Sequence, residues 1–190
     1  MIEFTREELI KIVPVGIATL VALLGWGVTY FHKWHFDRRA NRLERINRQL
    51  KELYGPLYIT LKTAHEAWES FVKKYWPNHG GKFYFSEEHE PTEDEKERWR
   101  TWMKNVFEPL HKKVENITMG NCDLFENGEI PESILEALAH VSVYKAVLAQ
   151  WEDNNYSEHI SINSWPTEAL MCEIEPKYKN LVKIQQELLG

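Results

Sequence analysis

Residues 12–31 constrain the fold of this chain most strongly, because these twenty residues contain no charged side chain. A helix rises about 1.5 Å per residue, so a helix of this length spans about 30 Å, the hydrocarbon thickness of a bilayer. A backbone in lipid must satisfy its own hydrogen bonds, which requires a helix there. Pro14 lies in the first turn, where its missing N–H has no helical acceptor. The sequence therefore predicts one transmembrane helix at residues 12–31.

Two other interpretations of residues 12–31 are weaker. A buried core helix can be equally apolar. A cleaved signal peptide has a shorter apolar run, a basic start and a small-residue cleavage site, and this segment has none of them. The residues around its end are instead aromatic, which is typical of a helix end at the lipid headgroups. They are Tyr30, Phe31, Trp34 and Phe36.

The charges on either side of the apolar segment predict its orientation. Residues 1–11 have a net charge of -1, whereas residues 32–51 contain seven Lys or Arg against two acidic residues, a net charge of +5. Positive charge near a span favours the cytoplasmic side. We therefore expect a short extracytoplasmic N-terminus at residues 1–11, a basic juxtamembrane helix at 32–54 and a helical cytoplasmic domain at 56–190. The widely separated Cys122 and Cys172 agree with a reducing compartment.

The basic residues after the apolar segment form a candidate binding site for anionic lipid headgroups. Each well-placed cation contributes about 1 kcal/mol to such binding. An alternative is that these side chains only fix the topology and are otherwise solvated. Residues 52–190 carry a net charge of -10, and the whole chain carries -6, which argues against nucleic acid as a partner. The candidate headgroup-binding residues, called the basic collar below, are Lys33, Arg38, Arg39, Arg42 and Arg45.

The remainder of the chain shows helical periodicity, with no strand alternation of useful length. An apolar seam at spacings of three and four predicts one helix to about residue 54 and a second at 56–76, with a kink or restart at Gly55-Pro56. Packing of the seam against later helices of the same chain is favoured over self-association. The seam consists of Leu43, Ile46, Leu50, Leu53 and Leu57.

Three further helices are expected after a loop at residues 77–81 and an extended piece at 82–85. Thr92 and Glu95 predict a capping box, followed by a helix with a kink at Pro109. The next helix starts with Pro131 in its first position and ends before Asp153, and its residues 134–151 are apolar on most of the circumference, which predicts a central helix. The last helix follows residue 166 and is expected to split or bend at Pro176. The predicted fold is all-α: one transmembrane helix, then a bundle of about four to five helices.

Three segments resemble an uncharacterised family of small single-pass bacterial membrane proteins. The first is Leu53-Tyr54-Gly55-Pro56-Leu57-Tyr58. The second contains Trp99, Trp102, Met103, Val106, Phe107, Pro109 and Leu110, and the third contains Leu138, Ala139, His140, Val141, Tyr144, Val147, Leu148 and Trp151, followed by Tyr156-Ser157-Glu158-His159. The resemblance covers roughly residues 40–190. It implies a bacterial inner-membrane anchor and a helical cytoplasmic domain, and it implies no activity.

Motifs for chemistry are weak in this sequence. Glu108 and His111 have a di-iron spacing, but the second copy that such a site needs is missing. No metalloprotease, nucleophile-elbow or phosphate-loop motif occurs. We therefore predict no catalytic residue, no metal site and no cofactor. The alternative is a membrane-tethered enzyme or sensor whose site is assembled from scattered residues, namely Glu66, Glu136, His140 and His159.

The function favoured by the sequence is that of a membrane-anchored, non-catalytic interaction protein: a scaffold, adaptor or accessory subunit with an unidentified protein partner. The candidate partner-binding residues are Phe83, Tyr84 and Phe85, which follow the helix-ending Pro77 and lie off the helical stripes. Large apolar groups in such a place need either a core position or a partner. Both interpretations stay open at this stage: the three aromatic residues either plug the end of the bundle or bind another protein.

Overall fold

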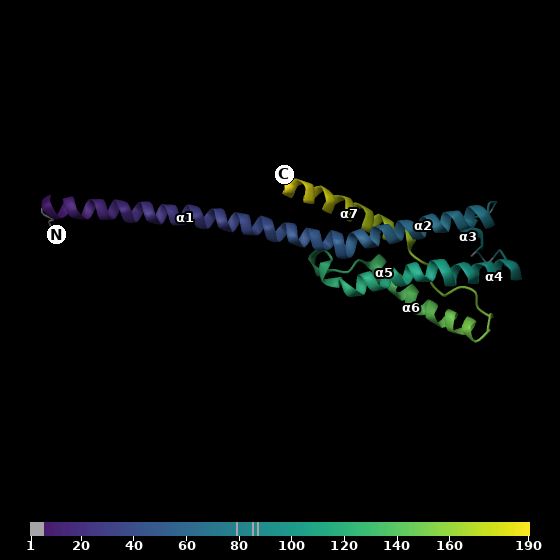
Figure 1. Cartoon of the computed structure of the whole chain (residues 1–190). Coiled ribbons are helices and arrows are strands. Elements are labelled where there is room, and N and C mark those ends of the chain that lie inside the picture. The colour runs from purple at the N-terminus through teal and green to yellow at the C-terminus, as the bar shows by residue number, and fades with distance from the viewer. Residues whose placement is uncertain (1–5, 79, 85, 87) are drawn as a thin grey trace. The chain divides into compact units, whose positions relative to one another are not determined.

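The computed structural model describes residues 6–78, 80–84, 86 and 88–190, and these residues form helices and no strand. The side chains of residues 6–16, Ala18 and Lys82 are not described. The predicted all-α class is confirmed (Figure 1). The chain divides into two units, residues 1–45 and 46–190.

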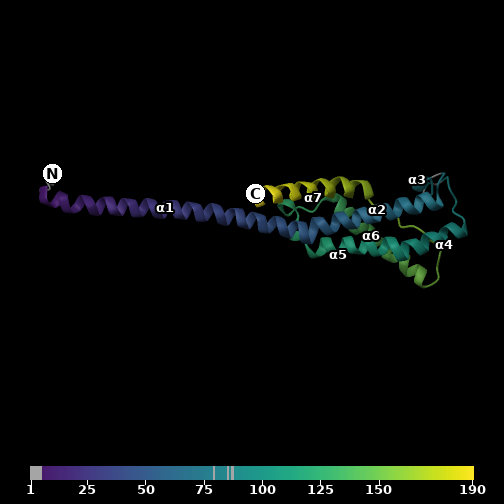
Figure 2. The same ribbon diagram turned by 45° about the horizontal axis from the view of Figure 1, so that its top comes forward.

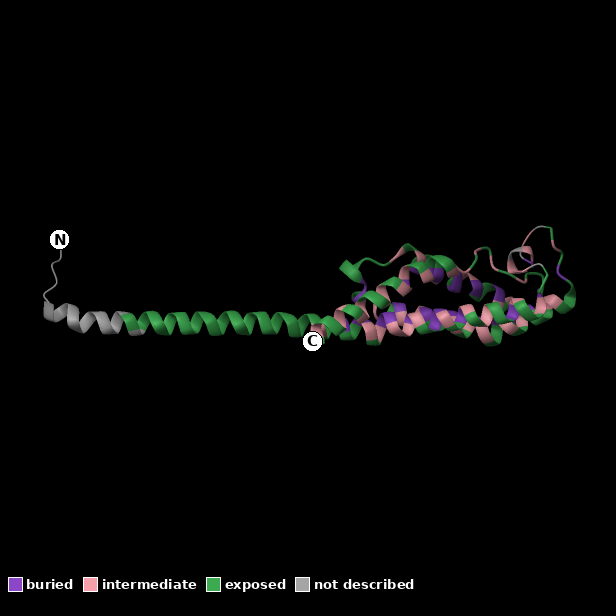
Figure 3. Ribbon diagram, turned by 90° about the horizontal axis from the view of Figure 1, so that it is seen from above, coloured by how far each residue is buried: buried purple, intermediate pink, exposed green. Residues whose placement is uncertain are grey.

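The first unit is built from helix α1 (Arg6–Arg48), whose last turn, from Ile46 onward, belongs to the second unit. The side chains described between residues 17 and 42 are exposed, as the green ribbon in Figure 3 shows. Within the described residues, no helix combines the length and the apolarity that crossing a membrane requires. Of the predicted transmembrane segment 12–31, the side chains of residues 12–16 and 18 lie outside the description. Residues 1–5 of the predicted N-terminal segment also lie outside it.

Helix α2 (Gly55–Tyr75) is the central helix of the second unit and packs against both α5 (Glu108–Gly120) and α7 (Thr167–Leu189) (Figure 2). Helix α6 (Glu132–Glu152) packs against α5 and α7. The predicted central position of residues 131–152 is therefore wrong. The sequence misleads because much of the apolar circumference of α6 is alanine, and Ala139, Ala146 and Ala149 are exposed. Pro131 precedes the helix as its N-cap residue.

Two prolines that were expected to kink or restart a helix follow wide π-helical turns. The turn η1 (Gln49–Tyr54) joins α1 to α2, and η2 (Met103–Phe107) joins α4 (Glu93–Trp102) to α5. In each turn a backbone N–H reaches the carbonyl five residues back, from Gly55 to Leu50 and from Glu108 to Met103. Pro56 and Pro109 come next in the chain. A proline has no N–H to donate to the preceding turn. The π turn shifts the hydrogen-bond partners by one residue, so the helices continue through both prolines. Helix α7 likewise contains Pro176 inside one uninterrupted element.

Leu53 and Leu57 of the predicted apolar seam pack in one core cluster with residues of α5, α6 and α7. Gln49 is also buried in η1, and its side-chain amide donates to the Leu124 carbonyl at 2.8 Å, which satisfies a polar group inside the core. The short 3-10 turns η3 (Cys122–Leu124) and η4 (Glu126–Gly128) close this end of the unit. The core here contains Leu53, Tyr54, Leu57, Leu61, Val114, Leu124, Phe125, Ile134, Ala137, Leu170 and Ile174.

A second core cluster, rich in aromatic rings, lies where α2, η2 and α6 meet. Trp99 and Trp151 are buried in this cluster, and Trp68 and Trp102 pack against it. Large rings bury much apolar area and gain further from edge-to-face contacts. The buried members are Phe71, Trp76, Tyr84, Trp99, Met103, Phe107, Tyr144, Val147 and Trp151.

The polar connector at residues 153–166 is fixed by side chains of the bundle. The indole N–H of Trp151 donates to the Glu158 carbonyl at 2.7 Å, and that of Trp99 donates to the His159 carbonyl at 2.8 Å. The His140 ring nitrogen Nδ1 lies 2.9 Å from the Asn163 carbonyl. A carbonyl accepts, so Nδ1 carries the proton. The third segment of the resemblance therefore supplies side chains that hold the connector in place.

Gly55 should be sensitive to substitution, because the π turn brings the Leu50 carbonyl oxygen to 2.3 Å from the position of a Cβ at residue 55. We expect Gly55→Ala to lower the free energy of unfolding by about 2 kcal/mol, as overpacking does. Gly120→Ala is the matched control, since nothing lies within 4 Å of its Cβ position, and alanine favours a helix by about 1 kcal/mol. Urea unfolding followed by circular dichroism measures both. A Gly55→Ala protein as stable as the wild type would contradict the steric role of the turn.

Candidate functional site

The candidate site lies after the end of α2, where a short helix replaces the extended piece expected at residues 82–85. Gly80 has a φ of 67°, the left-handed region that favours glycine, and begins α3 (Gly80–Tyr84). Gly81 lies against α2 so closely that a Cβ would come within 2.2 Å of the Trp68 ring. The extended prediction failed because two glycines permit this close turn. Phe85 lies outside the described residues.

The two described aromatic residues of the candidate partner-binding segment have different environments. Tyr84 is buried and stacks on Trp76, with ring centroids 3.8 Å apart and 20° between the planes. Burial raises the pKa of the Tyr84 phenol. Phe83 is half-buried, and its ring centroid lies 5.1 Å from that of His89. Tyr84 therefore fills a core position, while Phe83 lines the surface beside it.

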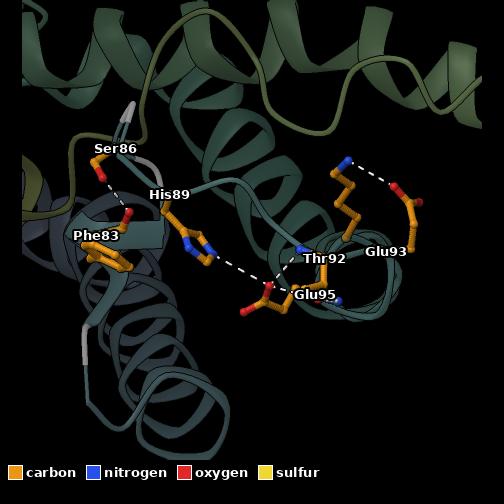
Figure 4. Close-up of polar contacts among 7 residues, drawn as sticks. Phe83, Ser86, His89, Thr92, Glu93 and Glu95 are labelled. Carbon is orange, nitrogen blue, oxygen red and sulfur yellow. Dashed lines mark hydrogen bonds and ion pairs between the residues drawn. The ribbon is translucent and has the colours of Figure 1, made fainter.

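A cavity of about 120 Å³ opens beside these residues. Four aromatic rings, one histidine and one carboxylate contribute to its wall, from the end of α2, from α3 and from the start of α4. Figure 4 shows the Phe83 and His89 rings side by side and His89 directed toward Glu95. The wall includes Tyr75, Trp76, Phe83, Tyr84, His89 and Glu95.

The carboxylate of Glu95 is held in place by the predicted capping box, which the structure confirms. Its Oε2 accepts from the Thr92 backbone N–H at 2.8 Å and from the Thr92 hydroxyl at 2.9 Å, and lies 3.6 Å from Nε2 of His89. Partial burial raises the pKa of Glu95, but these hydrogen bonds outweigh it and the net pKa is lowered. The cavity therefore contains a fixed negative charge at neutral pH.

The five residues of the basic collar lie on α1 in the first unit, and all are exposed. Arg38, Arg42 and Arg45 recur at spacings of four and three, so they share one face of the helix. The Arg38 guanidinium lies 3.8 Å from the centroid of the Trp34 ring, a cation–π contact. The collar thus combines accessible cations with an aromatic residue, as a headgroup-binding segment would.

Two histidines that the sequence analysis did not connect are brought together between α5, α6 and the connector. The His111 ring stacks on Trp165, with centroids 3.8 Å apart and 10° between the planes, and lies 5.3 Å from the His140 ring. Nδ1 of His111 and Nε2 of His140 are buried without a hydrogen-bond partner among the described residues. The spacings from Glu108 to His111 and from Glu136 to His140 were visible in the sequence, but which faces meet depends on helix packing.

This histidine pair does not extend to a metal-binding set within the described part of the chain, where no group of three or more suitable side chains converges. The residues of the alternative enzyme or sensor site are placed in different environments. Glu136 is exposed and His140 is buried, while His159 offers its carbonyl to Trp99. Glu66 lies on α2, and none of the four lines the cavity beside Phe83.

Comparison with protein-family models, with curated proteins and with solved structures finds no match to this chain. The resemblance to a family of single-pass bacterial membrane proteins therefore stays a prediction.

The buried histidines predict a loss of stability in acid. Burial, and secondarily the neighbouring His140, lowers the pKa of His111 to about 3, and burial also lowers the pKa of His140. An unfolded histidine has a pKa of about 6.5. The unfolded state therefore binds protons first as the pH falls, and stability is lost progressively below about pH 6.5.

For His111 alone this loss should reach about 2 kcal/mol between pH 7 and pH 5. His111→Phe keeps a ring that can stack on Trp165 and should remove that part of the pH dependence. His35→Phe, at an exposed position of α1, is the matched control and should leave it unchanged. Urea unfolding at the two pH values measures the difference. An equal acid loss in the wild type and in His111→Phe would refute the assignment.

Proposed function

We propose that this protein is a membrane-anchored, non-catalytic interaction protein, acting as a scaffold, adaptor or accessory subunit. In this proposal residues 12–31 cross a bacterial inner membrane once, with the N-terminus outside and the helical domain in the cytoplasm. The basic collar meets anionic headgroups, and the domain binds a protein partner. The proposal rests on the sequence pattern together with the surface properties of the two units.

The observation that carries the proposal is the exposed apolar surface of α1. Nine large apolar or aromatic side chains between residues 17 and 31 are between 58% and 69% exposed. Apolar surface on this scale needs a cover in a stable protein, and a helix that is apolar all round is typical of lipid. The side chains described in this stretch are fewer than the roughly 20 residues of a span. The proposed span therefore also includes residues 12–16 and 18. The nine are Ile17, Leu20, Val21, Leu23, Leu24, Trp26, Val28, Tyr30 and Phe31.

The exposed collar supports the proposed orientation. Its cations follow the apolar surface directly and are exposed, and in the proposed orientation they would meet lipid phosphates on the cytoplasmic side. The Trp34 ring against Arg38 has the amphipathic character that favours the membrane–water interface.

The second unit supports the interaction role. It has two well-packed core clusters, a surface that is acidic overall, and a cavity with aromatic and carboxylate walls. Such a rigid helical body with a small shaped recess is suited to recognition, because little has to be ordered when a partner binds.

The anchor predicts that the protein stays in the membrane fraction in high salt and leaves it only with detergent. Replacing Val21 and Leu24 together with Arg should release the protein, since each arginine near a span centre costs about 3 kcal/mol. Replacing Ile59 and Leu135 with Arg is the matched control, because both are exposed apolar residues of the second unit. Sedimentation of membranes and immunoblotting measure the outcome. Release of the wild type by salt alone would exclude the anchor.

The orientation predicts that a C-terminal tag is protected from protease added to intact spheroplasts and is cleaved after lysis. Changing Arg38, Arg42 and Arg45 to Gln should expose the tag in part of the population, because lysine and arginine near the span set the topology. Changing Lys183 on the exposed surface of α7 to Gln should have no such effect. Cleavage of the wild-type tag in intact spheroplasts would show the opposite orientation.

A further inference from the structure

We propose that the cavity lined by Phe83, His89 and Glu95 binds an alkylammonium group, the side chain of a lysine, free or N-methylated, on a basic segment of a protein partner. This inference rests on the proposed function and names the chemistry of the partner. It combines three properties of the described residues: aromatic walls, a fixed carboxylate and an acidic surrounding sequence.

The aromatic walls are suited to a cation. An ammonium group is attracted to the face of an aromatic ring, and cages of several rings recognise methylated ammonium groups. Trp76 and Tyr84 stack on each other and form the floor, where both are almost fully buried. The half-buried Phe83 supplies a more accessible ring at the side. A volume of about 120 Å³ equals that of about four liquid waters, which suits an ammonium group with its methyl substituents.

Glu95 supplies the countercharge. Thr92 holds its carboxylate through two hydrogen bonds, so little side-chain freedom is lost when a cation approaches. The lowered pKa of Glu95 keeps the carboxylate ionised at neutral pH. An ammonium that keeps an N–H can form a charge-assisted hydrogen bond to this carboxylate, which is about twice as strong as a neutral one. A trimethylated ammonium has no N–H and is attracted by the charge alone.

The segment that leads into α4 beside the cavity is acidic. Residues 87–95 contain six Asp or Glu and no Lys or Arg. The first cation after them, Lys96, pairs with Glu93 at 3.0 Å. Such a field attracts a basic segment and repels an acidic one. It also excludes an anion, because the acidic first turn of α4 already complements the positive end of the helix dipole.

Two cations of the chain lie near one wall of the cavity. The Lys74 ammonium is 5.1 Å and the Arg98 guanidinium 5.4 Å from the centre of the Tyr75 ring. Both cations therefore lie within cation–π distance of the Tyr75 ring. The ligand should therefore depend on Phe83 more than on Tyr75.

The test uses the full chain in a maltoside detergent, which contains no ammonium group. Trimethyllysine amide is titrated first. Choline, a cation, is then compared with its neutral isostere 3,3-dimethylbutanol, which has the same shape but no charge. NMR shifts of the Trp76 indole report binding, with Trp34 of the first unit as an internal reference. We expect saturable binding of the two cations and at least about tenfold weaker binding of the neutral alcohol.

Phe83→Leu keeps an apolar side chain but removes the ring, and should weaken trimethyllysine binding about tenfold. Tyr156→Leu is the matched control: Tyr156 is an exposed tyrosine with the Arg100 guanidinium 4.3 Å from its ring centre, and it does not line the cavity. Its loss should leave trimethyllysine binding unchanged.

A second pair of substitutions, Glu88→Gln with Glu90→Gln, tests the charge beside the cavity without removing a ring that the fold could need. This pair should weaken binding a few-fold in low salt and not at high salt.

The partner arm compares a lysine-containing basic peptide with the same peptide carrying norleucine in place of lysine. Loss of binding with norleucine supports a lysine ligand. Equal binding of 3,3-dimethylbutanol and choline, or no saturable shift at all, would overturn the inference. Binding to phosphatidylcholine vesicles without binding to the peptide would also overturn it and would indicate a lipid headgroup. The membrane-retention and topology experiments test the proposed function separately, so failure of the cavity alone leaves their outcome unchanged.

Discussion

The second unit depends on keeping α2 helical through Pro56, because α2 is the element that both α5 and α7 pack against. The π turn η1 makes this possible. It lets the Gly55 N–H reach the Leu50 carbonyl, and glycine is needed there because a Cβ would collide with that carbonyl. The same turn buries Gln49 next to the Leu124 carbonyl. One local change in hydrogen bonding thus sets the direction of the central helix and closes the core beside it.

The aromatic cluster connects the core to both surface features of this unit. Trp99 and Trp151 pack among buried rings, and their indole N–H groups donate hydrogen bonds to backbone carbonyls of the connector. Trp76 belongs to the same cluster and stacks on Tyr84, and the two rings form the floor of the cavity. Indole is suited to this double use because it joins a large apolar face to one polar donor. The cavity floor is therefore part of the core, because Trp76 and Tyr84 belong to the aromatic cluster.

The sequence predicted the features that depend on local pattern. The capping box at Thr92 and Glu95, the seam through Leu53 and Leu57, and the all-α class follow from spacing and were confirmed. The features that depend on packing were missed. Alanine counts as apolar in any periodicity, so α6 was placed at the centre although Ala139 is exposed. The contact of His111 with His140 and Trp165 needs three elements to meet, and no spacing within one element reveals it.

The charge distribution of the chain gives its two ends opposite interactions with an anionic membrane surface. An anionic membrane surface attracts the basic collar, at about 1 kcal/mol per cation near the surface, and repels residues 52–190, which carry a net charge of -10. Both effects decay over about 8 Å at physiological salt. With the proposed anchor in the bilayer, lipid therefore competes poorly for the acidic segment around Glu95, and a basic protein competes well. In the proposed function, the opposite charges of the collar and of residues 52–190 would separate membrane attachment from partner recognition.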